Sequence, residues 1–266
     1  MVQELSFNNK NMKYFKFGSG NKIMVMIPGL SIKSVMEYES SIINDYKVFE
    51  KEFSIYCFDR ISNPNENYSI KDMAKDTLEV LHLLNLKDIY LFGASQGAMI
   101  CFNMLLLEES LFKKFVVASS CTRVDDFINN SINGFIKYAK DKDKKELFLG
   151  FSKLIYPSEF FLKYENVLTD IIPTIKDEEL DKFIIFAKSI INFDIFEQVK
   201  DVNIPVLFVH DKLDNLININ NVYNFLDYYK YKNNFTNYFF EGFGHALYDL
   251  APDFKKVMKD FFLGSD

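Results

Sequence analysis

Several residue types are scarce in this 266-residue chain, and each scarcity argues against a class of protein. The chain has no Trp, only 10 Gly and 3 Cys, and a formal net charge of −6. An acidic chain without a basic cluster lacks the electrostatic footprint of a nucleic-acid-binding protein. The three cysteines are an odd number without a close pair, which argues against a metal motif or a redox motif. The sequence therefore predicts neither a nucleic-acid partner nor a cysteine-based metal site.

Long apolar runs are missing as well. No run approaches the ~18 apolar residues that a membrane-spanning helix needs. Residues 1–18 are polar and lack the apolar stretch of a signal peptide. The three histidines, His82, His210 and His245, show no metal-ligand spacing such as H-E-x-x-H. We therefore expect a cytoplasmic protein without a membrane partner, a metal or an organic cofactor; the oligomeric state stays open.

What the chain does contain is an alternation of apolar strands and amphipathic helices. With 48% hydrophobic residues it can bury the core of one large domain. Residues 12–17 are predicted to form an edge strand. Mostly apolar runs predict further strands at 22–27, 53–58, 89–94, 114–120, 205–210 and 236–242. Helical patterns lie between most of them, so the sequence predicts an α/β fold with a mainly parallel central sheet.

Residues 121–200 interrupt this alternation. They contain no convincing strand and consist of several amphipathic helical patterns, punctuated by Pro157 and Pro173. Because long structureless loops are rare inside a domain, we expect a helical cap or lid inserted between two strands. The predicted organisation is a core formed by residues 1–120 and 201–266, with the cap at 121–200.

The motif Gly93-Ala94-Ser95-Gln96-Gly97 lies where a predicted strand meets a predicted helix. It matches G-x-S-x-G, which chance would produce in roughly a few per cent of chains with so little Gly. A tight strand-to-helix turn needs nearly side-chain-free positions at Gly93 and Gly97. Such a turn presents the Ser95 hydroxyl at the carboxyl edge of the sheet, beside the free N–H groups of the helix. The motif predicts a nucleophile; the alternative is a Gly-Ser turn without a chemical role.

A serine nucleophile needs a base, and the base needs a carboxylate that orients it. His245 lies in a glycine-rich loop after the last predicted strand, which would let its imidazole reach Ser95. His82 lies inside a predicted helix, and the side chain of His210 is committed to a strand. Asp214 follows the strand at 205–210 and is the candidate for the acid.

Together these residues resemble the α/β-hydrolase family, and the resemblance extends over almost the whole chain. Ser95, Asp214 and His245 follow one another in that family's order. IPVLFVHDKLDNLI (204–217) resembles the family's acid loop, and FEGFGHALYDLAP (240–252) resembles its histidine loop. The resemblance implies that the backbone N–H groups of Leu30 and Gln96 form an oxyanion hole.

Two departures from the family leave alternatives open. Pro28-Gly29 stands where a His-Gly pair is frequent in the family. Asp211 stands where a Gly is common, so it is a rival for the acid, although the family's spacing favours Asp214. Asp125 or Asp126 is a weaker rival, because some members place the acid after the corresponding strand.

The resemblance implies a serine hydrolase that cleaves a small-molecule substrate through an acyl-enzyme, with His245 as the base. We expect a carboxylic ester with an apolar acyl group, because apolar side chains of the cap would face Ser95 across a cleft. Most apolar residues of the cap must hold it together and to the core, and some of the following would face Ser95: Phe127, Ile132, Phe135, Ile136, Tyr138, Phe148, Phe151, Leu154 and Ile155.

Other functions remain alternatives on the same fold. An aminopeptidase or amidase would need carboxylates that hold a substrate amine, and the cap carries Glu159, Glu165, Glu178 and Glu179. A thioesterase or a lactonase would use the same three residues. A ligand-binding protein with little turnover is a further alternative, which the intact Ser, His and Asp candidates disfavour.

Overall fold

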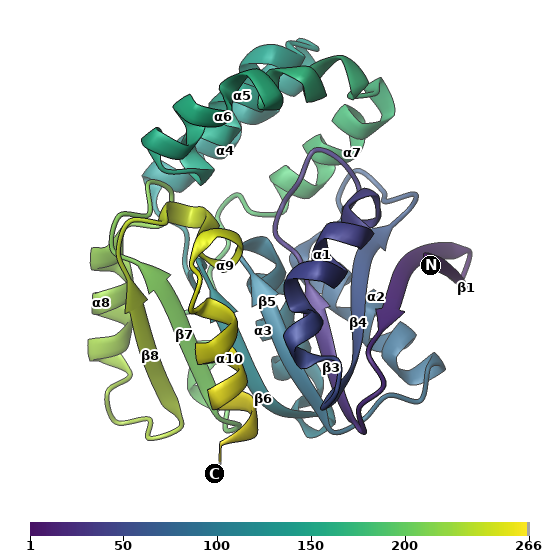
Figure 1. Cartoon of the computed structure of the whole chain (residues 1–266), viewed down its shortest axis with the longest axis vertical. Helices are drawn as coiled ribbons and strands as arrows, with labels where there is room; N and C mark the ends of the chain where they lie inside the picture. The colour runs from purple at the N-terminus through teal and green to yellow at the C-terminus, as the bar shows by residue number, and fades with distance from the viewer. Residues whose placement is uncertain (265–266) are drawn as a thin grey trace.

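The computed structural model describes residues 1–264 and contains one eight-stranded sheet with helices on both faces (Figure 1). The strands are β1 (Gln3–Phe7), β2 (Lys10–Phe17), β3 (Lys22–Ile27), β4 (Phe53–Ile61), β5 (Ile89–Ala94), β6 (Phe112–Ala118), β7 (Val206–Asp211) and β8 (Phe235–Phe240). The α-helices are α1 (Glu39–Tyr46), α2 (Ile70–Leu83), α3 (Gln96–Glu108), α4 (Asp126–Lys140), α5 (Lys144–Ile155), α6 (Ser158–Ile171), α7 (Asp177–Lys188), α8 (Ile219–Tyr228), α9 (Leu247–Leu250) and α10 (Phe254–Leu263). Short 3-10 helices are η1 (Val35–Tyr38), η2 (Lys47–Phe49), η3 (Glu109–Leu111), η4 (Ile172–Thr174), η5 (Gln198–Asp201) and η6 (Gly244–Ala246).

The strands lie in the order β1-β2-β4-β3-β5-β6-β7-β8. The neighbouring strands β4-β3-β5-β6-β7-β8 are all parallel. In contrast, β1 pairs with β2, and β2 pairs with β4, in the antiparallel sense. The sheet confirms the expected α/β fold with mainly parallel strands. Its central strands separate two hydrophobic clusters: in β5, Leu91 packs into one and Phe92 into the other. Burial on both faces explains why these strands are apolar throughout.

The edge of the sheet differs from the prediction. Residues 12–17 belong to β2, which lies between β1 and β4, so the edge strand is β1. Most residues of β1 are exposed, and its sequence QELSF carries a weak apolar signal. Asn8 and Asn9, with φ of 44° and 60°, join the two strands in the left-handed conformation that tight hairpin turns require.

Helices α4 to α7 lie between β6 and β7 in sequence and together cover the carboxyl ends of the strands (Figure 1). The chain enters and leaves this helical segment through a narrow neck. There the Val124 N–H donates to the Phe193 carbonyl, and the Ile195 N–H donates to the Thr122 carbonyl. Apart from one isolated bridge at this neck, residues 121–200 contain no β-structure.

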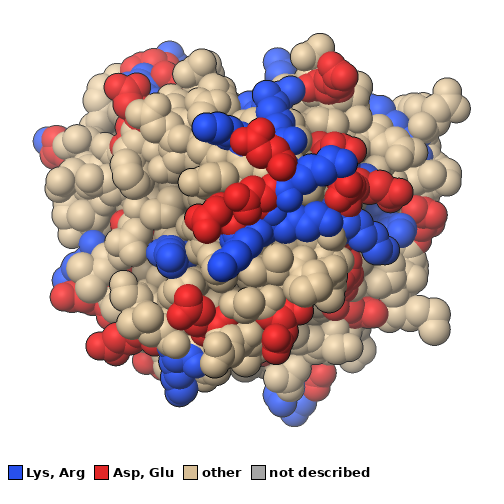
Figure 2. All heavy atoms as spheres, turned by 90° about the horizontal axis from the view of Figure 1, so that it is seen from above, with Lys and Arg blue, Asp and Glu red and all other residues tan. Residues whose placement is uncertain are grey.

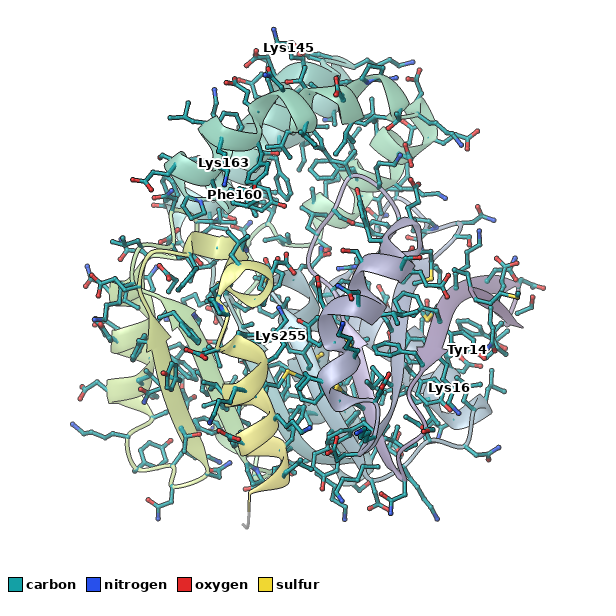
Figure 3. All side chains as sticks on the ribbon, viewed as in Figure 1. Tyr14, Lys16, Lys145, Phe160, Lys163 and Lys255 are labelled. Atoms are coloured by element: carbon teal, nitrogen blue, oxygen red, sulfur yellow. The ribbon has the colours of Figure 1, made fainter. Side chains whose placement is uncertain are left out.

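The helical segment presents charged side chains and a few large apolar ones, such as Leu162 and Val167, to solvent. On the face seen from above, Lys and Arg side chains are interspersed with Asp and Glu (Figure 2). Lys145 points away from the molecule, whereas Phe160 of α6 lies on the inner side and lines a cavity described below (Figure 3). No helix within residues 1–264 combines the length and the apolar character needed to cross a membrane.

Candidate active site

Ser95 lies in the sharp turn between β5 and α3. Its φ of 51° and ψ of −123° form a conformation that residues with a side chain rarely adopt. A Cβ at Gly93 would lie 2.6 Å from the Ala98 Cα, and one at Gly97 would lie 2.0 Å from the Ile27 carbonyl oxygen. Helix and strands therefore approach so closely that the turn depends on both glycines.

Three side chains from separate loops form a hydrogen-bonded chain at this turn. His245, in η6, has its Nε2 3.0 Å from Ser95 Oγ and its Nδ1 2.9 Å from Asp214 Oδ2. Oδ1 of Asp214 accepts hydrogen bonds from the N–H groups of Leu216 and Ile217 at 2.8 and 2.9 Å. Both His245 and Asp214 are buried. The carboxylate is thus held by the backbone on one side and orients the imidazole on the other.

Asp211, the rival acid of the sequence analysis, has other partners than His245. Its Oδ1 accepts hydrogen bonds from the N–H groups of Leu213 at 2.8 Å and Gly242 at 3.3 Å. Its Oδ2 accepts one from Phe243 N–H at 2.9 Å. Asp211 is fully buried and ties the loop that carries Asp214 to the loop that carries His245.

The remaining candidates lie away from Ser95. Asp125 caps the N-terminus of α4 and accepts a hydrogen bond from Asn221. Asp126 is exposed on α4, and His82 pairs with Glu108 on the surface at 2.8 Å. Within residues 1–264, no cluster of three or more His, Cys, Asp or Glu side chains could hold a metal ion.

Leu30 and Gln96 lie on two sides of Ser95. Gln96 is the first residue of α3, so its N–H has no carbonyl one turn earlier in the helix. Leu30 follows Gly29, where a Cβ would lie 3.2 Å from the Ser95 Cβ. The loop that precedes η1 therefore runs directly against the turn that carries Ser95.

A buried arginine that the sequence analysis missed connects these two sides. Arg60, near the end of β4, donates from one guanidinium nitrogen to the Pro28 carbonyl at 2.7 Å and to Gln96 Oε1 at 2.8 Å. Gln96 Nε2 in turn donates to the Phe186 carbonyl at 2.7 Å and to Ser189 Oγ at 3.1 Å. Burial lowers the pKa of the Arg60 guanidinium. The available signal was a charged residue at the carboxyl end of a buried strand, the edge where sites of α/β folds form.

A narrow cavity of about 30 Å³ contains Ser95 and His245. Its other walls are mostly apolar: Leu30, Met99, Ile128, Ile132, Phe151, Ile155, Ile190, Leu216, Ile217 and Tyr248. It shares Leu30, Ile155 and Tyr248 with a larger chamber of about 550 Å³ between the core and the helical segment. The Ser95 hydroxyl therefore lies in an apolar enclosure that shares wall residues with a wider one.

Of the nine apolar residues from which some were expected to face Ser95, four line the narrow cavity or the chamber: Ile132, Phe148, Phe151 and Ile155. None of the four cap glutamates lies on either wall. The carboxylates that line the chamber are Asp45 and Asp249, from α1 and α9.

Comparison with known proteins identifies the family. A family model described as alpha/beta hydrolase fold matches residues 23–252. The chain belongs to the α/β-hydrolase family. The resemblance that the motifs indicated is thereby confirmed, and the protein is a hydrolase enzyme.

Individual relatives of this hydrolase are distant in sequence and similar in fold. A curated relative, 3-oxoadipate enol-lactonase 1 of Acinetobacter baylyi, is 17% identical over 206 residues, which cover 73% of this chain and 77% of that protein. MGS-M2, an alpha/beta hydrolase enzyme from a Medee basin deep-sea metagenome library, superposes with a TM-score of 0.88 at 17% identity, covering 99% and 98% of the two chains. The esterase EaEST of Exiguobacterium antarcticum superposes with a TM-score of 0.78 at 18% identity, covering 95% of each chain.

Proposed function

We propose that this hydrolase cleaves small carboxylic esters with Ser95 as nucleophile, His245 as general base and Asp214 as the acid. The observation that carries the proposal is the unbroken chain of hydrogen bonds from Ser95 Oγ through both nitrogens of His245 to Asp214. A nucleophile and a base within hydrogen-bond reach, with the base oriented by a third group, are the requirements for serine catalysis.

The reaction has two halves. Ser95 Oγ attacks the ester carbonyl while its proton passes to His245 Nε2, and the tetrahedral intermediate then expels the alcohol, which takes that proton. Water gives a proton to His245 in the second half, and its oxygen attacks the acyl carbon. The bond between that carbon and Ser95 Oγ breaks, and the proton returns to Oγ. Asp214 fixes the tautomer and stabilises the imidazolium formed in each half.

The negative oxygen of the tetrahedral intermediates requires donors close to Ser95. We assign this role to the backbone N–H groups of Leu30 and Gln96, which belong to the two segments that meet at the nucleophile turn. Arg60 acts as a positioning residue, because it bonds both the Pro28 carbonyl and the Gln96 side chain. Its positive charge, bonded to both segments, would favour the charged intermediate.

The apolar walls of the narrow cavity favour an apolar acyl group. Each methylene that leaves water there contributes about 0.8 kcal/mol, close to fourfold in kcat/KM per methylene until the cavity is full. Charged acyl groups would lose their hydration without a counter-charge on the cavity wall. A short uncharged ester is the substrate class that this enclosure accepts.

The experiment is a comparison of kcat/KM for p-nitrophenyl butyrate and for an aminoacyl p-nitroanilide with a free amine. We expect the ester to be preferred by at least about a hundredfold. Asp45 and Asp249 on the chamber wall are the feature that would favour the amine, so Asp249→Asn is the matched control. A preference for the amine substrate that disappears in Asp249→Asn would replace the esterase proposal by an aminopeptidase.

A lactone is the second candidate substrate, because the curated relative is an enol-lactonase. A lactone is a cyclic ester, and the steps at Ser95, His245 and Asp214 would be the same. Its alcohol stays attached to the acyl chain, so the whole product must fit the enclosure. Parallel assays with γ-butyrolactone and ethyl butyrate distinguish the two substrate classes.

A further inference from the structure

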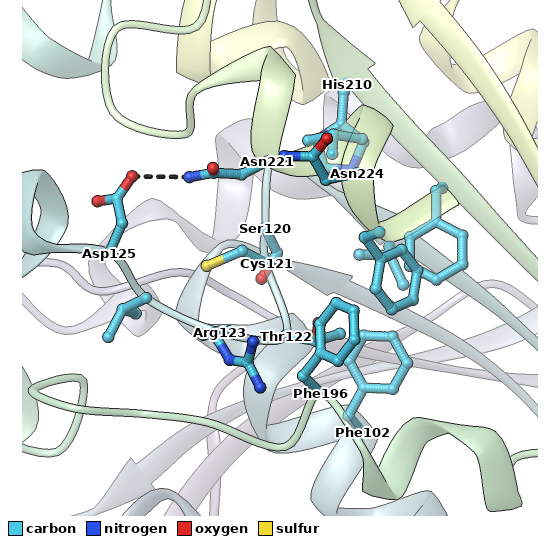
Figure 4. Close-up of a pocket in the computed structure, with 15 residues that line it drawn as sticks. Phe102, Ser120, Cys121, Thr122, Arg123, Asp125, Phe196, His210, Asn221 and Asn224 are labelled. Carbon is cyan, nitrogen blue, oxygen red and sulfur yellow. Dashed lines mark hydrogen bonds between the residues drawn. The ribbon is translucent and has the colours of Figure 1, made fainter. Parts of the chain in front are cut away.

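A second cavity lies between α3, α8 and the residues that follow β6, and it shares no lining residue with the narrow cavity or the chamber (Figure 4). Its volume is about 260 Å³. Four aromatic rings, those of Phe102, Phe196, Phe208 and Phe225, form much of its wall. An apolar cavity of about 150 Å³ is already large enough to bind benzene, so this one has room for a substituted ring.

One polar side chain inside this aromatic cavity lacks a partner. His210, at the end of β7, is only 2% exposed, and its Nδ1 has no hydrogen bond within residues 1–264. Burial lowers its pKa to about 4, so the imidazole is neutral at pH 7. A neutral imidazole has one N–H donor and one lone-pair acceptor, and either can pair with a hydroxyl group. The Nδ1 atom itself is sealed from solvent, whereas the ring as a whole lines the cavity and is a group that a ligand's hydroxyl can approach there.

The charged residues of this cavity are exposed or half-buried and already paired. Arg123 forms a salt bridge with Asp194 at 2.7 Å, and Asp125 accepts a hydrogen bond from Asn221 at 2.7 Å (Figure 4). Arg123 is exposed, and its guanidinium lies over the Phe196 ring at 4.5 Å from the centroid, while Asp125 is half-buried. The lining therefore offers aromatic surface and neutral hydrogen-bonding groups, among them His210, and its charged side chains already have partners.

We propose that this cavity is a second ligand site, which binds a small uncharged molecule with an aromatic ring and one hydroxyl group, a phenol in the simplest case. The ring packs against Phe102, Phe208 and Phe225, and the hydroxyl pairs with the imidazole of His210. The site is separate from the narrow cavity at Ser95, and Ser120 of its wall donates a hydrogen bond to the Ser95 carbonyl at 2.8 Å.

Calorimetric titration with 4-methylphenol and with toluene tests the chemistry of the site. The two probes have similar shapes, and only 4-methylphenol carries a hydroxyl. We expect His210→Leu to weaken the binding of 4-methylphenol about tenfold, as the loss of one hydrogen bond predicts, and to change toluene binding less than about threefold. The proposal would be overturned if His210→Leu weakened the binding of both probes equally, or if the unmodified enzyme showed no saturable binding of 4-methylphenol. The cavity would then hold only water.

A pair of space-filling variants tests the location. Val222→Phe narrows the second cavity, whereas Ile155→Phe narrows the chamber and the narrow cavity. We expect Val222→Phe to abolish 4-methylphenol binding and Ile155→Phe to leave it within about twofold. The reverse result would place the ligand beside Ser95 and contradict the proposal.

A measurement on the unmodified enzyme keeps the test decisive if Val222→Phe does not fold. Cys121 lines the second cavity and is half-buried, whereas Cys57 and Cys101 are buried and serve as internal controls. Saturating 4-methylphenol should slow alkylation of Cys121 by iodoacetamide at least about fivefold. An unchanged rate at saturation would contradict binding in this cavity.

Discussion

The carboxyl edge of the sheet and the helical segment above it are built in different ways. At the edge, polar side chains are fixed by buried hydrogen bonds: Asp214 and Asp211 each accept backbone N–H groups, and Ser120 bonds the Ser95 carbonyl. In the helical segment, aromatic rings pack against one another, such as Phe151 against Phe135 with centroids 5.3 Å apart. Directional bonds fix atoms to within tenths of an ångström, whereas apolar packing fixes shape and volume.

This difference assigns separate tasks to the two regions. The proposed chemistry needs fixed distances, and all of its groups come from the edge of the sheet. The proposed selectivity needs an apolar enclosure, and much of its wall comes from the helical segment. Few polar contacts join the regions, chiefly those of Gln96 with Phe186 and Ser189 and that of Lys33 with Thr174. Changes at the edge should therefore affect kcat, and changes in the segment should affect substrate preference.

The largest effect is expected from Asp214→Asn. The amide cannot accept the Nδ1–H of His245 and also keep its bonds to both backbone N–H groups, so the wrong tautomer is favoured. We expect kcat for p-nitrophenyl butyrate to fall about 10⁴-fold with little change in the free energy of unfolding.

Asp211→Asn is the matched variant three residues earlier. It places an NH₂ group against backbone N–H donors, so we expect a loss of about 2–3 kcal/mol in the free energy of unfolding. Activity of the folded fraction should fall far less than in Asp214→Asn. A greater loss of kcat in folded Asp211→Asn would reverse the assignment of the acid.

His210 should make the core sensitive to acid. Its pKa in the folded protein is about 4, lowered by burial, against ~6.5 for an unperturbed His. The unfolded chain therefore takes up the proton first as the pH falls, and stability is lost between about pH 6.5 and 4. The neighbouring charges are Asp214, which raises this pKa, and His245, which lowers it.

Urea unfolding at several pH values measures this effect. Between pH 6.5 and 4, the free energy of unfolding of the unmodified enzyme should fall about 3 kcal/mol more than that of His210→Leu. Parallel pH profiles of the two proteins would show that His210 does not titrate in this way.

Arg60→Met tests the connection between the loop after β3 and the start of α3. It leaves the Pro28 carbonyl and Gln96 Oε1 without this donor, and the loop that carries Leu30 should shift. We expect kcat to fall about 10–100-fold with KM nearly unchanged, because a displacement of about 1 Å has that cost. Arg60→Lys should recover part of the loss, and an equal loss in both variants would contradict a positioning role.

The smallest effect is expected from Ile155→Ala in the helical segment. This residue lines the narrow cavity and the chamber, so its truncation removes apolar contact with the acyl chain. We expect kcat/KM for the butyryl ester to fall about 3–10-fold while that for the acetyl ester changes less than twofold. Equal losses for both esters would mean that the segment does more than shape the enclosure.

The sequence was most informative where a function depends on neighbouring residues. Five consecutive residues predict the turn around Ser95, because Gly93 and Gly97 allow the helix and the strands to approach each other closely there. The strands were visible because burial on both faces makes them apolar throughout. The family resemblance then indicated His245 and Asp214, which lie far from Ser95 along the chain. In the structure, His245 Nε2 lies 3.0 Å from Ser95 Oγ, and His245 Nδ1 lies 2.9 Å from Asp214 Oδ2.

The sequence was least informative where a role depends on contacts between distant segments. Asp211 and Asp214 are equally acidic and three residues apart, and only the folded loops distinguish their partners. Arg60 bonds residues that lie 32 and 36 positions away, which no local pattern encodes. The glutamates of the helical segment were plausible by composition, but none of them lines the narrow cavity or the chamber.

Covalent labelling with a fluorophosphonate tests the central claim most directly, because this probe traps a serine only when a neighbouring base activates it. Peptide mapping by mass spectrometry of the labelled enzyme should locate one adduct per chain, on Ser95. Ser95→Ala should take up no label, and His245→Ala should react at least about 10³-fold more slowly. A folded enzyme that stays unlabelled, or that carries the adduct on another residue, would contradict the account.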